Sequence, residues 1–198
     1  MHISEGILSA PVLGVGAGLT AAGCAVGLKK MDYKDIPKVA VLSSGFFVAS
    51  LIHVPLGPTS VHLILNGLVG LLLGWAVFPA ILIALFLQAI LFQFGGITTL
   101  GVNTFNMALP GLVAFYLFSK ATRGKNHFKA IVAAFLAGVT GVLFAGIFVA
   151  ISLVFTGKPF LFLAKTVIFA HVPVMIIEGI VTSFIVVFLR KVKPELLL

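Results

Sequence analysis

The fold depends on the apolar stretch between Val61 and Phe94, VHLILNGLVGLLLGWAVFPAILIALFLQAILFQF. As a single helix this stretch would be about 50 Å long, whereas the hydrocarbon core of a bilayer is roughly 30 Å thick. Gly74-Trp75 and Pro79 lie near its middle, and such residues commonly end a helix and allow the chain to turn. The stretch is therefore either one overlong helix or two antiparallel helices.

The positions of the basic residues distinguish these two alternatives. Eleven of the 13 Lys and Arg residues lie in three segments, 29–38, 120–129 and 190–193. If residues 61–94 form two helices, all three segments fall on one side of the membrane. If they form one helix, the first segment falls opposite the other two. Because basic loops gather on the cytoplasmic side, the sequence predicts two helices here.

Composition indicates a membrane protein. Of the 198 residues, 61% are hydrophobic and only 9% are charged, whereas soluble domains carry about 25% charged residues. The net charge of +8 is accounted for by the basic inner loops, so we do not expect a nucleic-acid partner. We expect one domain, residues 1–198, in the inner membrane of a bacterial or archaeal cell. It should be an all-α integral membrane protein with the N-terminus outside, the C-terminus inside, and seven transmembrane helices at about 7–28, 39–54, 61–73, 78–94, 104–118, 130–155 and 167–189.

The first two residues can form a metal chelate. A start Met followed by His is normally not cleaved, so the chain should begin with a free amine. The Met1 amine, the His2 backbone nitrogen and the His2 Nδ1 can bind one ion through a five-membered and a six-membered ring. Such a planar set leaves one position for another imidazole and suits Ni(II) or Cu(II), and Co(II) less well. Segment 1–6 is the candidate metal-binding segment; the alternative is that Met-His is an ordinary chain start.

His62 is the candidate for the fourth nitrogen. It follows residues 55–60, PLGPTS, whose prolines and glycine force an irregular backbone that must be covered by protein or line a cavity. Asn66, one helical turn later, could orient the His62 ring as an outer contact. His53 ends the second expected span on the same outer side and is a candidate neighbour of the site. The alternative is a capped helix start with an interfacial histidine.

Residues 88–107 connect the fourth and fifth expected spans on the outer side. They are rich in Gly, Thr and Asn and contain no charged residue. This composition favours a re-entrant loop whose backbone groups are satisfied by side chains such as Asn103 and Asn106, which are further candidates for outer contacts to the metal ligands. The alternative is an ordinary extracellular loop.

The last expected span contains two ionisable residues, His171 and Glu178, which lie seven positions apart and therefore on nearly one helix face. An intramembrane Glu is a candidate functional residue, and here it could contact substrate or hydrogen-bond across the bundle. A membrane metalloenzyme using both residues is an alternative function, but it would need a third ligand and an open coordination position. A stand-alone permease is another, but it would need a polar pore, and most spans have very few polar residues.

Four stretches together resemble the CbiM/NikM family, the metal-specific S components of energy-coupling-factor importers for cobalt and nickel. The similarity extends over nearly the whole chain. One departure is Phe94, where many relatives have an acidic residue or a His before the Gly-Gly pair. The matching stretches are Met1-His2-Ile3-Ser4-Glu5-Gly6, Gly57-Pro58-Thr59-Ser60-Val61-His62-Leu63, Gln88 to Met107, and Ala170-His171-Val172-Pro173 with Glu178-Gly179.

The resemblance implies a transport subunit that catalyses no reaction and has no cofactor. It implies that Co(2+) or Ni(2+) is bound as substrate by Met1, His2 and His62, on an N-terminus threaded into the bundle from outside. The implied partners are a transmembrane coupling subunit, two ATP-binding subunits and often a small accessory membrane subunit. The residues of the motifs are more similar to those of the cobalt-named branch, whereas a planar site of four nitrogens favours nickel. Both ions therefore remain candidates.

Overall fold

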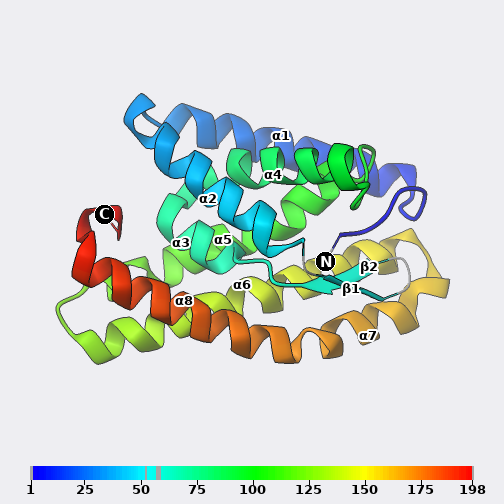
Figure 1. Ribbon diagram of the computed structural model, residues 1–198. Helices are drawn as coiled ribbons and strands as arrows, with labels where there is room; N and C mark the ends of the chain where they lie inside the picture. Colours follow the sequence, from blue (N-terminus) through cyan, green and yellow to red (C-terminus); the bar gives the residue numbers. More distant parts are fainter. Residues whose placement is uncertain (1, 52, 57–58, 198) are drawn as a thin grey trace.

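The computed structural model describes residues 2–51, 53–56 and 59–197 of the chain. It is a bundle of helices with one antiparallel β-hairpin at its side (Figure 1). The elements are α1 (Ala10–Lys30), η1 (Tyr33–Asp35), α2 (Ile36–Ala49), β1 (His53–Leu56), β2 (Thr59–His62), α3 (Asn66–Leu73), η2 (Gly74–Ala76), α4 (Val77–Phe92), α5 (Leu100–Arg123), α6 (His127–Thr156), η3 (Lys158–Phe160), α7 (Leu161–Ala170), α8 (Val172–Val192) and η4 (Pro194–Leu197).

The helices have the length and composition of membrane spans. Within the described chain, five helical segments are long and apolar enough to cross a bilayer, which agrees with an integral membrane protein. Helix α2, with 14 residues, is shorter. The five segments are Ala10–Lys30, Asn66–Phe92, Leu100–Arg123, His127–Thr156 and Leu161–Val192.

The segment Asn66–Phe92 is helical along its whole length, but the chain changes direction within it. Gly74 has φ +55° and ψ −125°, a backbone conformation that is readily accessible only to glycine. Helix α3 therefore ends at this residue, and η2 carries the chain into α4. The turn occurs at the Gly-Trp pair where the sequence predicts it.

Packing against α5 shows that α3 and α4 run in opposite directions. Along α3, the Asn66 side chain donates to the Met107 carbonyl and Gly70 lies on Gly111, so α3 follows the direction of α5. Helix α4 begins beside Gly111, which contacts Val77, and ends at the short connection that leads into the first turn of α5. It is therefore antiparallel to α5, so α3 and α4 are two helices of opposite direction.

Helix α3 occupies the middle of the bundle because its small residues allow close approach. A Cβ at Gly70 would lie 2.1 Å from the Gly111 carbonyl oxygen, and a Cβ at Gly67 would lie 2.3 Å from that of Ala137. Seven of its eight residues are buried. This contact of small residues with α5 and α6 is the packing that membrane helices favour.

Several expected boundaries differ from the structure. The helix expected over 39–54 is α2, which begins at Ile36 and ends at Ala49, and residues 53–56 form β1 instead. The helix expected from residue 61 begins at Asn66, because β2 occupies Thr59–His62. The hairpin pairs His53 with His62 and Leu56 with Thr59. The other expected helices correspond to α1, α4, α5 and α6, and the last, expected over 167–189, is longer and divided at His171 into α7 and α8.

The expected re-entrant loop over residues 88–107 is wrong in extent. Gln88 lies inside α4, where its side-chain amide donates to the Phe47 carbonyl at 3.0 Å and contacts Ser50. Asn103 and Asn106 lie inside α5. Only residues 93–99 connect the two helices. Of the polar side chains that suggested a loop, Gln88 and Asn106 bond neighbouring helices and Asn103 bonds the N-terminal segment.

Candidate metal site

The residues before α1 fold back into the bundle as an extended segment. In Figure 1 this deep-blue segment runs from the start of α1 toward the β-hairpin. Ile3 is fully buried, and Asn103 of α5 binds both of its backbone groups. The Ile3 N–H donates to Asn103 Oδ1 at 2.9 Å, and Asn103 Nδ2 donates to the Ile3 carbonyl at 3.0 Å. One amide side chain therefore fixes the residue directly after His2.

A second group of contacts holds the segment at Glu5. The Glu5 N–H donates to the Gly95 carbonyl at 3.1 Å. The Glu5 carboxylate accepts hydrogen bonds from the backbone N–H of Thr98, at 2.9 Å, and from its hydroxyl. These hydrogen bonds hold the pKa of Glu5 below its ordinary value, so the carboxylate is ionised at neutral pH. Gly95, with φ +74°, brings the loop backbone against His2.

His2 and His62 lie next to each other at the end of this segment. Their ring centroids are 4.7 Å apart and the ring planes are inclined by 26°. Both residues are buried, with exposed fractions of 5% and 3%. The Phe94 ring lies 6.3 Å from that of His2 and covers it with an apolar surface. The fold thus brings together two imidazoles that are 60 positions apart in the chain.

The His62 ring is held in one tautomer. Its Nδ1 lies 2.7 Å from the Leu63 carbonyl, which can only accept a hydrogen bond, so Nδ1 carries the proton and Nε2 keeps its lone pair. Burial lowers the pKa of His62 well below its usual value. The imidazole is therefore neutral, the form that binds metal, at neutral pH and somewhat below.

Glu178 of α8 positions the backbone just after His62. Its carboxylate accepts hydrogen bonds from the backbone N–H groups of Ile64 and Leu65, the latter at 2.8 and 3.0 Å. Leu65 adopts a left-handed conformation, with φ +54°, which is costly for a residue other than glycine. The buried carboxylate stabilises this turn between β2 and α3. Its role in the structure is contact across the bundle, one of the two roles expected for it.

The remaining candidate residues lie in different places. Asn66 does not orient His62, because its two amide protons go to the Met107 and Gly141 carbonyls at 3.0 Å each and its oxygen accepts from Gly67. Asn106 instead donates a hydrogen bond to the Ser152 hydroxyl of α6 at 3.2 Å. Its expected place beside the metal ligands is therefore not supported.

His53 and His171 differ in how near they come to the site. The backbone of His53 pairs with His62 across the hairpin. His171 is fully buried at the junction of α7 and α8, with its Nδ1 2.7 Å from the Val167 carbonyl. His171 is near enough to His62 for a weak electrostatic interaction. Within the described residues, however, no three His, Cys, Asp or Glu side chains cluster closely enough to hold a metal. Met1, the other expected ligand, lies outside the described residues.

Sequence reasoning missed the contacts that hold the N-terminal segment. Glu5, Thr98 and Asn103 form them, and only the Gly95-Gly96 pair signalled an unusual backbone there. What the site offers chemically is two buried imidazoles beside a clamped N-terminal segment. Any further ligands from described side chains would have to come from groups other than a third His, Cys, Asp or Glu.

Comparisons with known proteins give a consistent result. The family model CbiM, described as the cobalt uptake substrate-specific transmembrane region, matches residues 2–196. A putative metal transport protein of Haemophilus influenzae is 45% identical, covering 100% of this chain and 97% of that protein. The cobalt transport protein CbiM of Clostridium tetani is 34% identical over 96% of this chain and 85% of its own. A fused nickel transport protein, NikMN, of Rhodobacter capsulatus is 32% identical, and this chain spans 64% of its length.

A solved structure has the same fold. A transition metal transporter superposes with a TM-score of 0.79, at 28% identity, over 97% of this chain and 93% of that one. A truncated transition metal transporter gives a TM-score of 0.75 at 27% identity. The similarity therefore extends to the arrangement of the helices as well as to the sequence.

Proposed function

This chain belongs to the CbiM family of transmembrane cobalt-uptake proteins, and from that premise we propose that it is the substrate-binding subunit of an ATP-driven importer for cobalt or nickel. In this proposal it captures the divalent ion from outside the cell and catalyses no reaction. The observation that carries the proposal is the buried pair of His2 and His62, held together by a clamped N-terminal segment.

The metal would be bound by four nitrogens. His2 would supply its backbone nitrogen and Nδ1, Met1 its amine, and His62 its Nε2. The tautomer of His62 supports this assignment, because a proton on Nδ1, directed at the Leu63 carbonyl, puts the lone pair of the ring on Nε2. Two buried imidazoles beside the apolar Phe94 ring would favour an ion whose waters have been replaced by ligands. Cobalt and nickel are the ions carried by the named relatives.

The chain would cross the membrane seven times, with α2 to α4 each contributing a short span and α7 and α8 together forming the last. The N-terminus would lie outside and the basic ends of α1, α5 and α8 inside. Those basic residues include Lys29, Lys30, Lys120, Arg123, Arg190 and Lys191.

ATP hydrolysis would reside on partner subunits. The sequence contains no phosphate-binding loop of the G-x-x-x-x-G-K-[ST] type, so the chain would act with two ATP-binding subunits, a coupling subunit in the membrane and often a small accessory subunit. A metalloenzyme is less well supported, because both oxygens of Glu178 are taken by backbone N–H groups. A permease acting alone is less well supported because polar side chains in the bundle are bonded between helices rather than along a pore.

We expect that cells producing this chain alone accumulate nickel or cobalt no faster than cells without it. Accumulation should rise when the coupling and ATP-binding subunits are produced together with it, because only they supply the energy for transport. Uptake of radioactive nickel or cobalt, with and without an ATPase-inactive partner, measures this. Rapid uptake by the chain alone would instead indicate a permease.

We expect metal binding to weaken steeply between about pH 7.5 and 5.5, because amine and imidazole ligands bind only when deprotonated. The pKa of His62 is lowered by burial, so protons compete for this ligand only at a lower pH than they would for an exposed imidazole. At higher pH protons compete less and the affinity rises, whereas at lower pH protonation of the amine and imidazole ligands removes the affinity. Titration with Ni(II) at several pH values measures the dependence.

The same titration reports on the geometry of the site. A metal bound in a plane by four nitrogens, including the deprotonated His2 amide, should release more than one proton. It should also give the yellow colour of low-spin Ni(II). A pale green complex with shallow pH dependence would mean that the amide is not a ligand and that the site is a cluster of histidine and water.

A further inference from the structure

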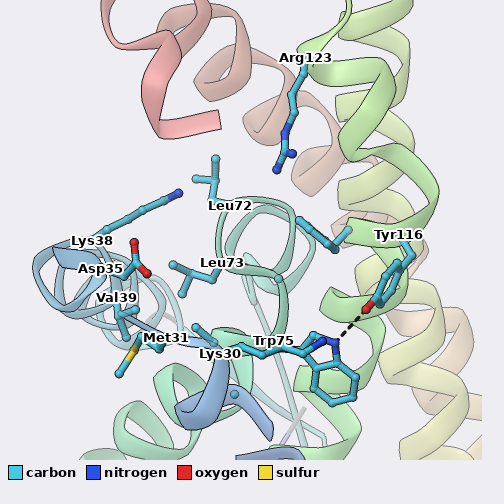
Figure 2. Close-up of a pocket in the computed structure, with 14 residues that line it drawn as sticks. Lys30, Met31, Asp35, Lys38, Val39, Leu72, Leu73, Trp75, Tyr116 and Arg123 are labelled. Carbon is cyan, nitrogen blue, oxygen red and sulfur yellow. Dashed lines mark hydrogen bonds between the residues drawn. The ribbon is translucent and has the colours of Figure 1, made fainter. Parts of the chain in front are cut away.

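A second polar cavity lies at the other end of the molecule. It has a volume of about 380 Å³, within the range of small-molecule sites. It lies where α1 ends, whereas the histidine pair lies before α1 begins, and this 21-residue helix is about 30 Å long. Its walls come from the ends of α1 and α3, the starts of α2 and η2, and α5, as Figure 2 shows.

Three cations line this cavity against one carboxylate. Lys30, Lys38 and Arg123 are the cations and Asp35 is the carboxylate. In Figure 2, Lys38 and Arg123 extend from opposite sides, with Leu72 between their tips. Within the described chain, the ion pairs are Lys34–Asp32 and Lys193–Glu195, so none of the three cations forms one. The cavity therefore carries an excess of positive charge that the chain does not neutralise.

Aromatic rings hold two of these cations in place. Lys30 Nζ lies 5.2 Å from the centre of the Trp75 ring, and the Arg123 guanidinium lies 5.6 Å from that of Phe115. Trp75 Nε1 donates to the Tyr116 hydroxyl at 2.8 Å. Because stacking on a ring already restricts these side chains, they lose little further side-chain entropy when a ligand binds. The charges are thus set around the cavity before any ligand arrives.

We propose that this cavity binds the phosphate group of an anionic phospholipid from the inner leaflet. Basic pockets between membrane helices at the cytoplasmic surface are suited to such headgroups. Three donors from three helices can surround one phosphate, while Leu72, Leu73 and Val39 supply apolar walls beside it.

The position of the aromatic residues favours a lipid over a soluble anion. Trp and Tyr gather at the headgroup level of a bilayer, where a ring with one polar edge is most stable. Trp75 and Tyr116 lie at the rim of the cavity, and Tyr116 is 60% exposed. A ligand entering the cavity beside this pair would come from the headgroup region. Bound there, it would fix the turn at Gly74 to the ends of α1 and α5.

The test uses the full chain purified in a neutral detergent and freed of lipid. Binding of phosphatidylglycerol, of phosphatidylcholine and of inorganic phosphate is measured by native mass spectrometry and by the shift in unfolding temperature. The variants are Lys30→Gln, Arg123→Gln and their combination. Lys29→Gln is the matched control, because this substitution removes the same charge from the same helix. Lys29 is next to Lys30 but does not line the cavity.

We expect the wild type and Lys29→Gln to retain phosphatidylglycerol in preference to phosphatidylcholine. Each cavity variant should weaken that binding about fivefold and the double variant about twenty-fivefold, from roughly 1 kcal/mol for each basic residue. All variants should bind Ni(II) as the wild type does, which separates this proposal from the proposed function.

Three results would overturn the proposal. Equal loss in Lys29→Gln would mean that only overall charge matters. Inorganic phosphate binding as tightly as phosphatidylglycerol would make this a site for a soluble anion. Cavity variants that bind lipid normally, but no longer associate with the coupling subunit, would show that an acidic group of that protein occupies the cavity.

Discussion

An N-terminal extension should abolish tight metal binding and leave the fold intact. Acetylation or a tag removes the Met1 amine as a ligand and moves the His2 chelate away from the chain end. Residues added before His2 would also have to be accommodated next to a buried side chain, because His2 is 5% exposed and lies between the His62 ring and the Gly95 backbone. The contacts that hold the segment begin at Ile3 and Glu5, so they can form in the extended protein.

The measurement is titration with Ni(II) of protein with a retained N-terminal tag, against the same protein with a C-terminal tag. Circular dichroism and the unfolding temperature without metal serve as controls for the fold. Inserting one residue between Met1 and His2 should also weaken binding, because it replaces the five- and six-membered rings by a larger chelate. Unchanged affinity in the extended protein would refute a chelate formed by the chain terminus.

The position of the segment, as distinct from its ligands, can be tested at Asn103. Replacing Asn103 by Leu removes both hydrogen bonds to the Ile3 backbone, which together contribute about 2 kcal/mol. Because these bonds hold the segment in its metal-binding position, we expect metal affinity to fall roughly thirtyfold. Asn106→Leu is the matched control, since Asn106 is equally buried and bonds Ser152 instead. Equal effects of the two changes would mean that the clamp does not govern binding.

The parts of the fold predicted from sequence are those that depend on charge and periodicity. The turn at Gly74 followed from the side on which the basic loops lie, and the structure places the helix end at that glycine. The His2 and His62 pair followed from the donor chemistry of the chain start and from the irregular segment before His62. Both inferences rest on properties of the residues themselves, such as charge and nitrogen donor atoms, which do not depend on the surrounding fold.

The parts not predicted depend on backbone partners that leave no pattern in the sequence. Asn66 was expected to face His62, but a side-chain amide bonds any carbonyl within reach, and the close approach of α3 to α5 and α6 places two carbonyls beside it. Asn103 likewise binds the backbone of Ile3, which any residue would offer. The β-hairpin was missed because its Pro-rich, apolar sequence lacks the alternation that identifies a strand.

His62→Ala should cost more metal affinity than any other histidine substitution outside the N-terminal segment. Its ring is buried against His2, and with Nδ1 donating to the Leu63 carbonyl the lone pair of the ring is on Nε2. Loss of an outer contact to a metal ligand costs 10–100-fold in affinity, so loss of the ligand itself should cost about 100-fold or more. His127 is exposed at the first turn of α6, and His127→Ala should leave affinity unchanged.

His53→Ala makes the comparison stringent, because the backbone of His53 is paired with that of His62 in the hairpin. A change that acts only by loosening the hairpin should affect both variants alike, whereas a change of ligand should affect His62→Ala alone. Ni(II) titrations are combined with the unfolding temperature without metal, since removing a buried ring can also lower stability. An equal loss of affinity in His53→Ala would mean that His62→Ala acts by loosening the hairpin and not by removing a metal ligand. Retention of tight binding in His62→Ala would remove this histidine from the metal site, and the stacked pair of rings would then be a packing contact that closes the cavity.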